Sequence, residues 1–503
     1  MRIRFAFISA LLILLVPGCM KKAPIHYAPE SQSIVQARLF YAHLDRAVAT
    51  ENNQNARGNR IKGFPFLRTN RFLTHLKGRL NTRTQKKDWV THLQALDLSA
   101  RKSEIRTLTD AAVRSLINAL DMGHISSRQD LIRHLKPYSD RLLAQGETNA
   151  EFYNTLIQRT RSPDEYSGVM RIFGGYPLAY GPILYFTRRS YGRMEQTHQQ
   201  PLSALKVRGH LVQYTPKANS RRTRTSAQDI FSTTPKDSLG IHRFTPDNLF
   251  LLAAWFAPVY TQDTAGQNDL FGRVVWQKNR VDINPEKPSV YYYFSYAALN
   301  QTPVFQINYV IWFSSREGPD VPWYEKGRLD GFNVRVTLDP AGVPIMVDMV
   351  HNCGCYHFFV PKKEWVSAIK PFANLVGTMV PAWMPRGFPE KRLALRISSG
   401  RHQVENVGIQ DPSAGAQPYD LIPYKTLEAL KQGPGTHKSI FDPRGIVKGT
   451  QRIEPYLLFS AGIPEIGAMR QRTRQATRLI GREHFDNPLI FTNHFEFRPF
   501  QSE

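Results

Sequence analysis

The residues best equipped for chemistry lie together between His351 and His357, where the chain reads His-Asn-Cys-Gly-Cys-Tyr-His. Apart from Cys19 near the N-terminus, this segment holds every cysteine of the chain, and a histidine stands at each end. Thiolates and imidazoles are ligands for zinc and copper, and neighbouring thiols can form a disulfide. The segment is therefore the main candidate site.

The geometry of this site depends on Gly354. In a straight strand, His351 and His357 would lie roughly 20 Å apart at about 3.3 Å per residue, and one ion would not reach both. Glycine at the midpoint can adopt positive φ and fold the chain back. We expect such a reversal, which gives a candidate transition-metal site, for zinc or copper, of His351, Cys353, Cys355 and His357.

Two other interpretations of the segment stay open. Cys353 and Cys355 can form a strained disulfide across Gly354 and act as a thiol-disulfide redox pair. Alternatively, the thiols and imidazoles are structural, and the protein is a non-enzymatic envelope scaffold or binding protein. A single-cysteine acyl-transfer enzyme is less natural because the thiol is duplicated. The chain has no H-E-x-x-H, G-x-S-x-G or Walker A motif, so the sequence does not decide whether it is an enzyme.

Further polar groups for the site are sought near the C-terminus. His484 and Asp486, and again His494 and Glu496, are spaced by two on presumed strands, where each pair offers a ligand or a carboxylate that orients an imidazole. A helix is predicted over residues 464–480. It would align three arginines at a spacing of four as a candidate anion-binding stripe: Arg470, Arg474 and Arg478.

The N-terminus indicates export. Arg2 and Arg4 precede an apolar run from Phe5 to Val16, shorter than the roughly 20 residues of a membrane-spanning helix. The sequence Val16-Pro17-Gly18-Cys19 resembles the lipobox of bacterial lipoproteins. This resemblance implies that residues 1–18 are a signal peptide and that residues 19–33 are a tether carrying palmitate-type acyl chains on Cys19, which anchor the protein to a membrane.

Met20, rather than Asp, follows Cys19, and this implies an outer-membrane lipoprotein that faces the periplasm. The body of the chain resembles only uncharacterised envelope lipoproteins. The net charge is +25, or 25 − 2 = +23 without Arg2 and Arg4. A basic protein in this compartment is expected to meet anionic envelope components, and no nucleic acid is expected as a partner. Residues 52–87 carry ten lysines or arginines and no acid, which is typical of a basic surface segment.

The apolar pattern divides the chain into four parts. Helical spacing predicts an all-α domain over residues 34–161, and a segment rich in aromatics, glycine and proline predicts an irregular junction over residues 162–206. Short β-branched runs predict an antiparallel β domain over residues 207–400, and residues 401–503 read as a mixed C-terminal region with a basic helix. The fold class is therefore α+β.

The candidate site is expected at the end of a strand. Residues 332–338 alternate in polarity, and Asp339-Pro340-Ala341-Gly342 has the composition of a turn. The return strand then runs straight into His351, so that an antiparallel sheet positions the site.

Overall fold

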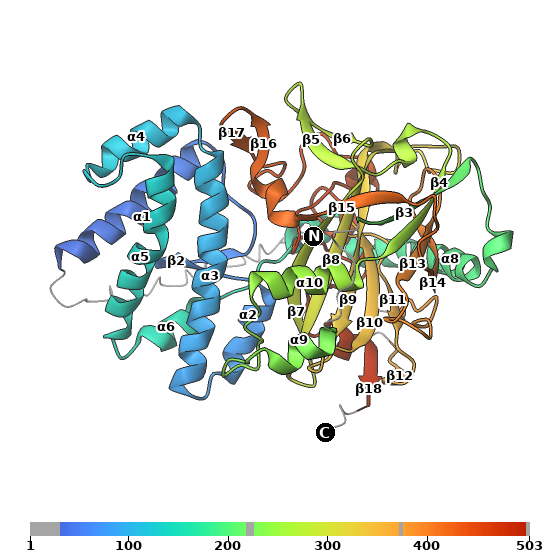
Figure 1. Cartoon of the computed structure of the whole chain (residues 1–503), viewed down its shortest axis with the longest axis horizontal. Helices are drawn as coiled ribbons and strands as arrows, with labels where there is room; N and C mark the ends of the chain where they lie inside the picture. The colour runs from blue at the N-terminus through green and yellow to red at the C-terminus, as the bar shows by residue number, and fades with distance from the viewer. Residues whose placement is uncertain (1–30, 218–225, 372–375, 499–503) are drawn as a thin grey trace, which may run out of the picture.

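The computed structural model describes residues 31–217, 226–371 and 376–498. A helical N-terminal part lies beside a larger part built on one curved β-sheet, which confirms the predicted α+β class (Figure 1). The expected signal peptide, Cys19 and most of the tether fall in residues 1–30, outside the described residues. Within the described ranges, no helix is long and apolar enough to cross a membrane.

The N-terminal part is mainly helical, as the sequence predicts. Its helices include α1 (Gln32–Thr50), α3 (Arg83–Thr107), α4 (Asp110–Leu120), α5 (Arg128–Glu147) and α6 (Phe152–Arg159). Thr82, Thr109 and Ser127 each begin a helix by accepting a hydrogen bond from a backbone N–H of its first turn. Apolar side chains at helical spacing then fill a common core.

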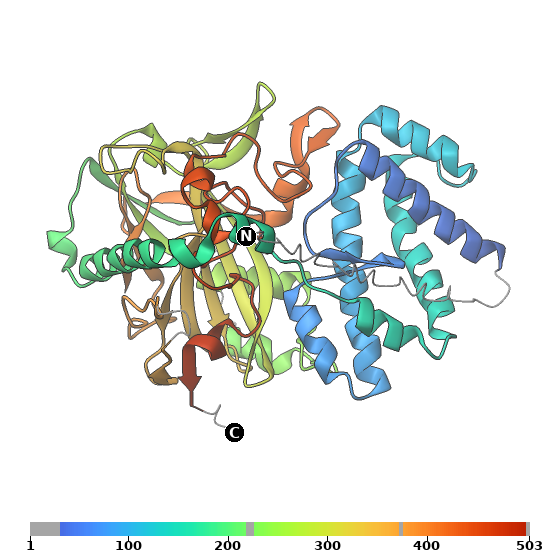
Figure 2. The ribbon, with the colours of Figure 1, turned by 180° about the vertical axis from the view of Figure 1, so that it is seen from behind.

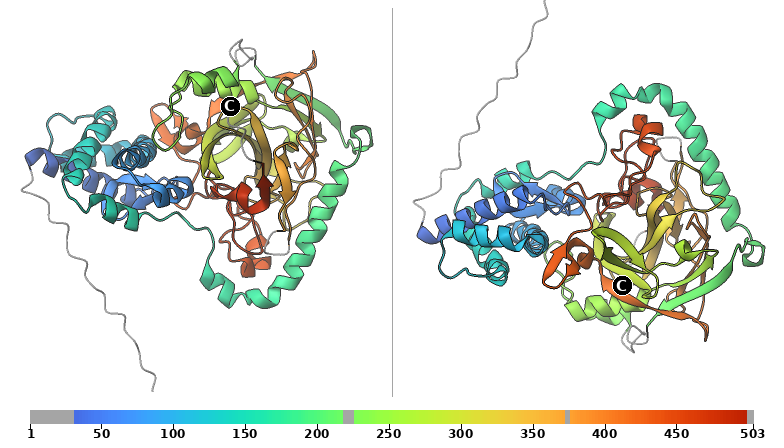
Figure 3. Two further views of the ribbon diagram at one scale, coloured as in Figure 1. Left: turned by 90° about the horizontal axis from the view of Figure 1, so that it is seen from below. Right: turned by 90° about the horizontal axis from the view of Figure 1, so that it is seen from above.

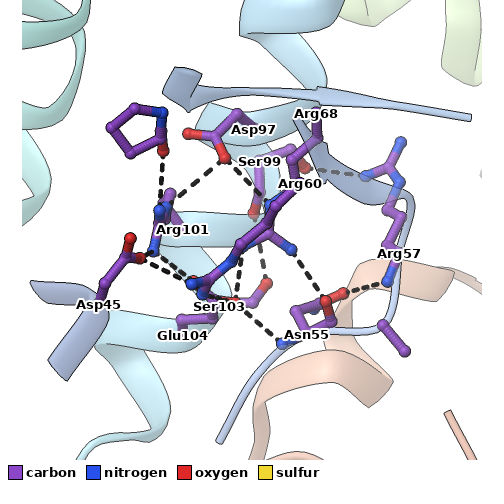
Figure 4. A network of polar contacts seen from close by, with 12 residues as sticks. Asp45, Asn55, Arg57, Arg60, Arg68, Asp97, Ser99, Arg101, Ser103 and Glu104 are labelled. Atoms are coloured by element: carbon purple, nitrogen blue, oxygen red, sulfur yellow. Dashed lines mark hydrogen bonds and ion pairs between the residues drawn. The ribbon is translucent and has the colours of Figure 1, made fainter. Parts of the chain in front are cut away.

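The basic segment within this part is folded into it. Residues 59–79 form β1 (Asn59–Ile61), β2 (Phe64–Thr69), α2 (Arg71–Leu76) and η1 (Lys77–Arg79), so the domain is not purely helical. Arg68 is buried, with Nε 3.0 Å from Asp97 and Nη2 2.7 Å from Glu104 (Figure 4). The acids that neutralise this arginine, Asp97 and Glu104, come from α3 and lie outside the basic segment.

The predicted irregular junction is wrong over most of its length. The chain forms α7 (Gly168–Phe173) and the long α8 (Tyr176–His198), which follow the outer rim of the β part (Figure 3). Pro177 lies in the first turn of α8, where its missing N–H costs nothing. Pro182 lies further in, and the packing of Ile183, Met194 and His198 against the β part offsets its cost.

The main sheet has ten strands in the order β11-β10-β9-β8-β7-β15-β3-β4-β13-β14. Most neighbours are antiparallel, but β15 runs parallel to β3 and β7, and β13 runs parallel to β4. The strands are β3 (His210–Pro216), β4 (Val259–Thr264), β7 (Ser289–Leu299), β8 (Thr302–Arg316), β9 (Gly327–Leu338), β10 (Pro344–His351), β11 (Phe358–Pro361), β13 (Leu393–Ile397), β14 (Val404–Ile409) and β15 (Gln417–Pro423).

The central sheet contains two hairpins, and the second confirms the turn predicted at residues 339–342. Strands β7 and β8 pair up to Leu299 and Thr302, and Asn300 and Gln301 between them both have positive φ, as a tight two-residue hairpin requires. Between β9 and β10, Asp339 Oδ1 accepts hydrogen bonds from the backbone N–H groups of Ala341 and Val343. This turn sets the register that carries β10 into His351.

Both faces of the sheet are covered. Ile307, Tyr309 and Ile311 of β8 pack in one core with the residues of α10 (Pro246–Phe256), beside α9 (Ala227–Thr233). Val310 and Trp312 point to the opposite core, which the C-terminal segment covers. Because both faces are buried, β8 is a near-continuous apolar run.

The C-terminal region contains few regular elements. Its helices are η5 (Tyr424–Ala429), α11 (Glu454–Leu457), η6 (Phe459–Ala461) and α12 (Ile490–His494). The small sheets pair β5 (Arg273–Gln277) with β6 (Arg280–Asn284), β12 (Val366–Ile369) with β18 (Phe495–Phe497), and β16 (Leu430–Gly433) with β17 (Thr436–Lys438). The predicted helix over residues 464–480 is wrong, because this segment is an irregular, buried strap with Gly467 at positive φ.

Candidate functional site

The chain reverses at the His351–His357 segment, as the sequence predicts. The Gly354 N–H donates to the His351 carbonyl at 2.7 Å, the His351 N–H donates to the Cys355 carbonyl at 2.9 Å, and β11 then returns antiparallel to β10. Gly354 has φ +101°, and a Cβ there would lie 2.4 Å from the Ala476 carbonyl oxygen. The C-terminal strap therefore closes over a turn that only glycine fits.

The reversal leaves the two imidazoles in separate hydrogen-bond networks. Arg316 Nη1 lies 3.2 Å from His351 Nδ1, whereas His357 Nε2 lies 2.9 Å from Asp348 Oδ2. Asp348 is also held by Arg335, whose Nε lies 2.9 Å from Oδ1. Among the residues that the structure describes, no group of three or more His, Cys, Asp or Glu side chains is arranged to hold a metal ion.

The two thiols, by contrast, act as one pair. Both are free, Cys353 is buried and Cys355 is partly exposed. A hydrogen bond from the Cys355 thiol lowers the pKa of Cys353 to about 6 against the opposing effect of burial, and the charges of Arg452 and His351 act in the same direction. The same hydrogen bond and burial raise the pKa of Cys355 well above its ordinary value. The hydrogen bond between the thiols therefore favours the thiolate form of Cys353 and the thiol form of Cys355.

Buried ionic groups support the turn from the sheet side. Arg316 Nη2 lies 2.7 Å from Glu325 Oε2, and the Tyr356 hydroxyl donates to Glu325 Oε1 at 2.7 Å. Arg316 Nη1 also pairs with Asp330 Oδ2 at 3.2 Å. These contacts hold Tyr356, which has positive φ, next to the thiols.

A histidine that the sequence analysis did not single out completes this network. His402 places Nδ1 2.9 Å from Asp330 Oδ2 and Nε2 3.1 Å from Asp269 Oδ1, and its ring stacks on Phe313 with centroids 3.8 Å apart. Although burial lowers the pKa of His402, its hydrogen bonds to the two aspartates raise it above the ordinary value. His402 links three segments of the β part, and its two aspartate partners favour its charged form.

The thiol pair adjoins a cavity of about 540 Å³. Gly354, Cys355 and Tyr356 form part of its wall, and the remainder comes from α8, α11 and the C-terminal strap. Figure 2 shows α8 lying across this side of the β part, close to the C-terminal segments. Most of the lining is apolar, including Ile183, Phe186, Leu457, Ile463 and Ile466. An apolar pocket with a few convergent polar groups is the usual form of a small-molecule site.

Glu454 contributes an acidic side chain to the wall of this cavity. It lies in the wall, and its Oε2 has no hydrogen-bond partner. Burial, followed by the charge of Cys353, raises the pKa of Glu454 to about 8. The carboxyl group is therefore mainly protonated at neutral pH, close to the thiol pair.

The C-terminal residues proposed for the site lie in different parts of the structure. His494 reaches the His357 side of the turn, because both rings contact Phe359, with centroid distances of 4.8 and 4.4 Å. His484 accepts a hydrogen bond from the Glu165 N–H, and Asp486 pairs with Arg71 at 2.7 Å, so both belong to the contact with the helical part. Glu496 is exposed on β18.

The three arginines proposed as an anion-binding stripe do not form a stripe. Arg470 and Arg474 both pair with Glu165, at 3.6 and 2.8 Å. Arg478 pairs with Glu483 at 3.2 Å and also lines the cavity. All three are paired within the fold, where they join the C-terminal strap to the rest of the protein.

Sequence reasoning missed the groups that come to the turn from elsewhere. Arg316, Glu325 and Glu454 stand in no recognisable motif, and only folding brings them to the thiols. The apolar residues of α8 were the available signal for the cavity, but glycine and proline between them suggested an irregular segment. Comparisons with protein-family models, with curated proteins and with solved structures find no match, so the proposal below rests on the site itself.

Proposed function

We propose that this chain is a thiol-disulfide redox protein of the bacterial envelope, with Cys353 and Cys355 as its reactive pair. The observation that carries the proposal is the placement of the pair: Cys355 lies in the wall of the cavity, and Cys353 lies behind it as its hydrogen-bond partner. The apolar lining suits a disulfide whose substituents are partly apolar.

The reaction takes two exchange steps. Movement of the shared proton places the negative charge on Cys355, whose sulfur attacks one sulfur of the substrate disulfide and releases the other as a thiolate. Glu454 is placed to protonate that thiolate. Cys353 then gives its proton to the Glu454 carboxylate and attacks the Cys355 sulfur, which forms the Cys353–Cys355 disulfide and releases the second substrate thiolate. That thiolate takes a proton from water. The substrate gains two electrons from the cysteine pair and two protons, one from the pair through Glu454 and one from water.

The location is part of the same proposal. The lipobox-like Val16-Pro17-Gly18-Cys19 supports export and anchoring through an acylated Cys19 in the outer membrane, facing the periplasm. Disulfides form and exchange in that compartment, whereas the cytosol keeps thiols reduced.

Trapping of the mixed disulfide tests the chemistry. Incubated with glutathione disulfide, Cys353→Ser is expected to gain one glutathione at Cys355, seen as a stable mass increase, because the resolving thiol is missing. Cys355→Ser is the matched control and is expected to react at least tenfold more slowly, because Cys353 is buried. If neither variant gains glutathione while both remain folded, the redox proposal is wrong.

Metal analysis of the same protein tests the alternative interpretation of the segment as a transition-metal site. We expect the purified chain to titrate two thiols and to carry no zinc or copper. About one equivalent of either metal, with the thiols protected until a chelator is added, would instead favour a transition-metal site at Cys353 and Cys355.

A further inference from the structure

An exposed apolar surface surrounds one side of the cavity. It consists of α7, α8 as far as Arg193, and α11 with η6, and we call it the rim surface. Phe173, Leu178 and Tyr456 are 82%, 87% and 84% exposed, which is unusual for large apolar side chains. The other exposed apolar residues of the rim surface are Val169, Ile172, Tyr185, Phe186, Ile453, Leu457 and Phe459.

The rim surface is continuous although its parts are far apart in sequence. The Ser167 N–H donates to the Gly462 carbonyl at 2.7 Å, and Arg171 Nε donates to the Ala461 carbonyl at 2.9 Å. A Cβ on Gly174 would lie 2.7 Å from Ser460 Cα, so α7 packs directly on η6. In Figure 3, α7 and α8 lie along the outer rim of the β part.

The α7–α8 part of this surface is positively charged. Residues 167–194 contain four arginines, at positions 171, 188, 189 and 193, and no aspartate or glutamate. Arg188, Arg189 and Arg193 are exposed on α8, beside the exposed Tyr185 and Phe186. Exposed aromatic and aliphatic groups next to arginines are typical of helices that lie in the headgroup layer of an anionic membrane.

We propose that the rim surface docks on an anionic lipid bilayer. The apolar side chains enter the headgroup and upper acyl region, and the arginines attract lipid phosphates. Three exposed arginines beside exposed aromatic side chains match the phosphate and acyl layers of an anionic bilayer, and this combination favours lipid as the partner. The docking does not depend on the proposed redox chemistry or on acylation of Cys19.

The docking also orients the cavity. Phe186 and Leu457 are both exposed on the rim surface and part of the cavity wall. The cavity therefore borders the face that would contact lipid, and docking would place Cys355 near the bilayer surface.

Vesicle co-sedimentation tests the docking. The chain starting at Met20, which retains every described residue, is mixed with phosphatidylcholine vesicles that contain about a third phosphatidylglycerol. The triple variant Phe173→Ser, Leu178→Ser and Phe186→Ser is expected to bind at least tenfold more weakly than the parent. The control carries Val35→Ser, Leu39→Ser and Leu211→Ser, three exposed apolar residues elsewhere, and is expected to bind like the parent.

The salt dependence of binding and the oligomeric state of the parent provide two further tests. Binding of the parent is expected to fall at least fivefold between 0.05 and 0.5 M salt, where the Debye length shrinks to a few Å. Equal losses in the test and control variants, or no binding by the folded parent, would overturn the proposal. So would a parent dimer that the test variant abolishes, because the rim surface would then be covered by a second copy of the chain.

Discussion

At the scale of single residues, Gly354 sets the geometry of the thiol pair. Gly354→Val combines a β-branched residue at φ +101° with a Cβ 2.4 Å from the Ala476 carbonyl oxygen. We expect it to lower the free energy of unfolding by about 2 kcal/mol or more, measured by urea titration. Gly123→Val, where a Cβ meets nothing within 4 Å, is the control and should change it little. A Gly354→Val protein as stable as its parent would contradict the strained turn.

His402 gives the β part a pH dependence. Its folded pKa is raised by Asp269 and Asp330 above the unfolded value, so its contribution to stability is complete below about pH 6.5 and is lost as the pH rises through the folded pKa. His402→Gln should therefore cost more stability at pH 6 than at pH 9. Denaturant titrations of parent and variant at the two pH values measure this difference. A cost that is equal, or larger at pH 9, would show that His402 is not held as a cation.

The role of a single residue could be predicted from the sequence only where that role depends on the residue itself and its neighbours in the chain. Gly354 at the centre of a Cys-x-Cys pair was enough to predict the reversal, because the required φ belongs to one residue. The environment of the thiols was not predictable in the same way. Arg316, Glu325 and Glu454 reach the turn from three separate segments, and no spacing in the sequence links them.

At the scale of elements, buried ion pairs hold the basic segment to α3. Burial raises the pKa of Glu104, but the charges of Arg68, Arg101 and Arg60 outweigh it and lower the pKa to about 2. Glu104→Gln should cost about 3–5 kcal/mol, because it leaves buried arginines short of a partner. Lys136→Gln breaks an exposed pair at the same 2.7 Å distance and should cost less than about 1 kcal/mol. Similar costs in urea titrations would contradict this difference in burial.

Helices and strands followed the sequence pattern where one face or both faces are plainly apolar. The helices of the N-terminal part and the β7–β8 and β9–β10 hairpins are such cases. The pattern failed for α8, where tertiary packing overrides Gly181, Pro182 and Gly192. It failed again at residues 464–480. The arginines there have the spacing of a helix, but the segment is irregular and they form separate ion pairs with Glu165 and Glu483.

At the scale of the whole molecule, two membrane attachments are proposed, and fractionation separates them. Cys19→Ser removes the acylated residue but leaves the rim surface. We expect the exported variant to remain with membranes at low salt and to be released by 0.5 M salt, whereas the parent resists the wash. Adding the rim substitutions should release Cys19→Ser at low salt. A Cys19→Ser protein that resists high salt would show that acylation is not the anchor.

Cys353 and Cys355 are proposed to cycle between dithiol and disulfide. A redox titration in glutathione buffers, read by alkylation and peptide mass mapping, measures this directly. We expect both thiols to disappear together in a reversible two-electron transition to an intramolecular Cys353–Cys355 disulfide. Its potential should lie above about −300 mV, because the small ring across Gly354 is strained. Two thiols that stay free at every redox potential of the buffer, or a disulfide that joins two chains, would contradict this cycle.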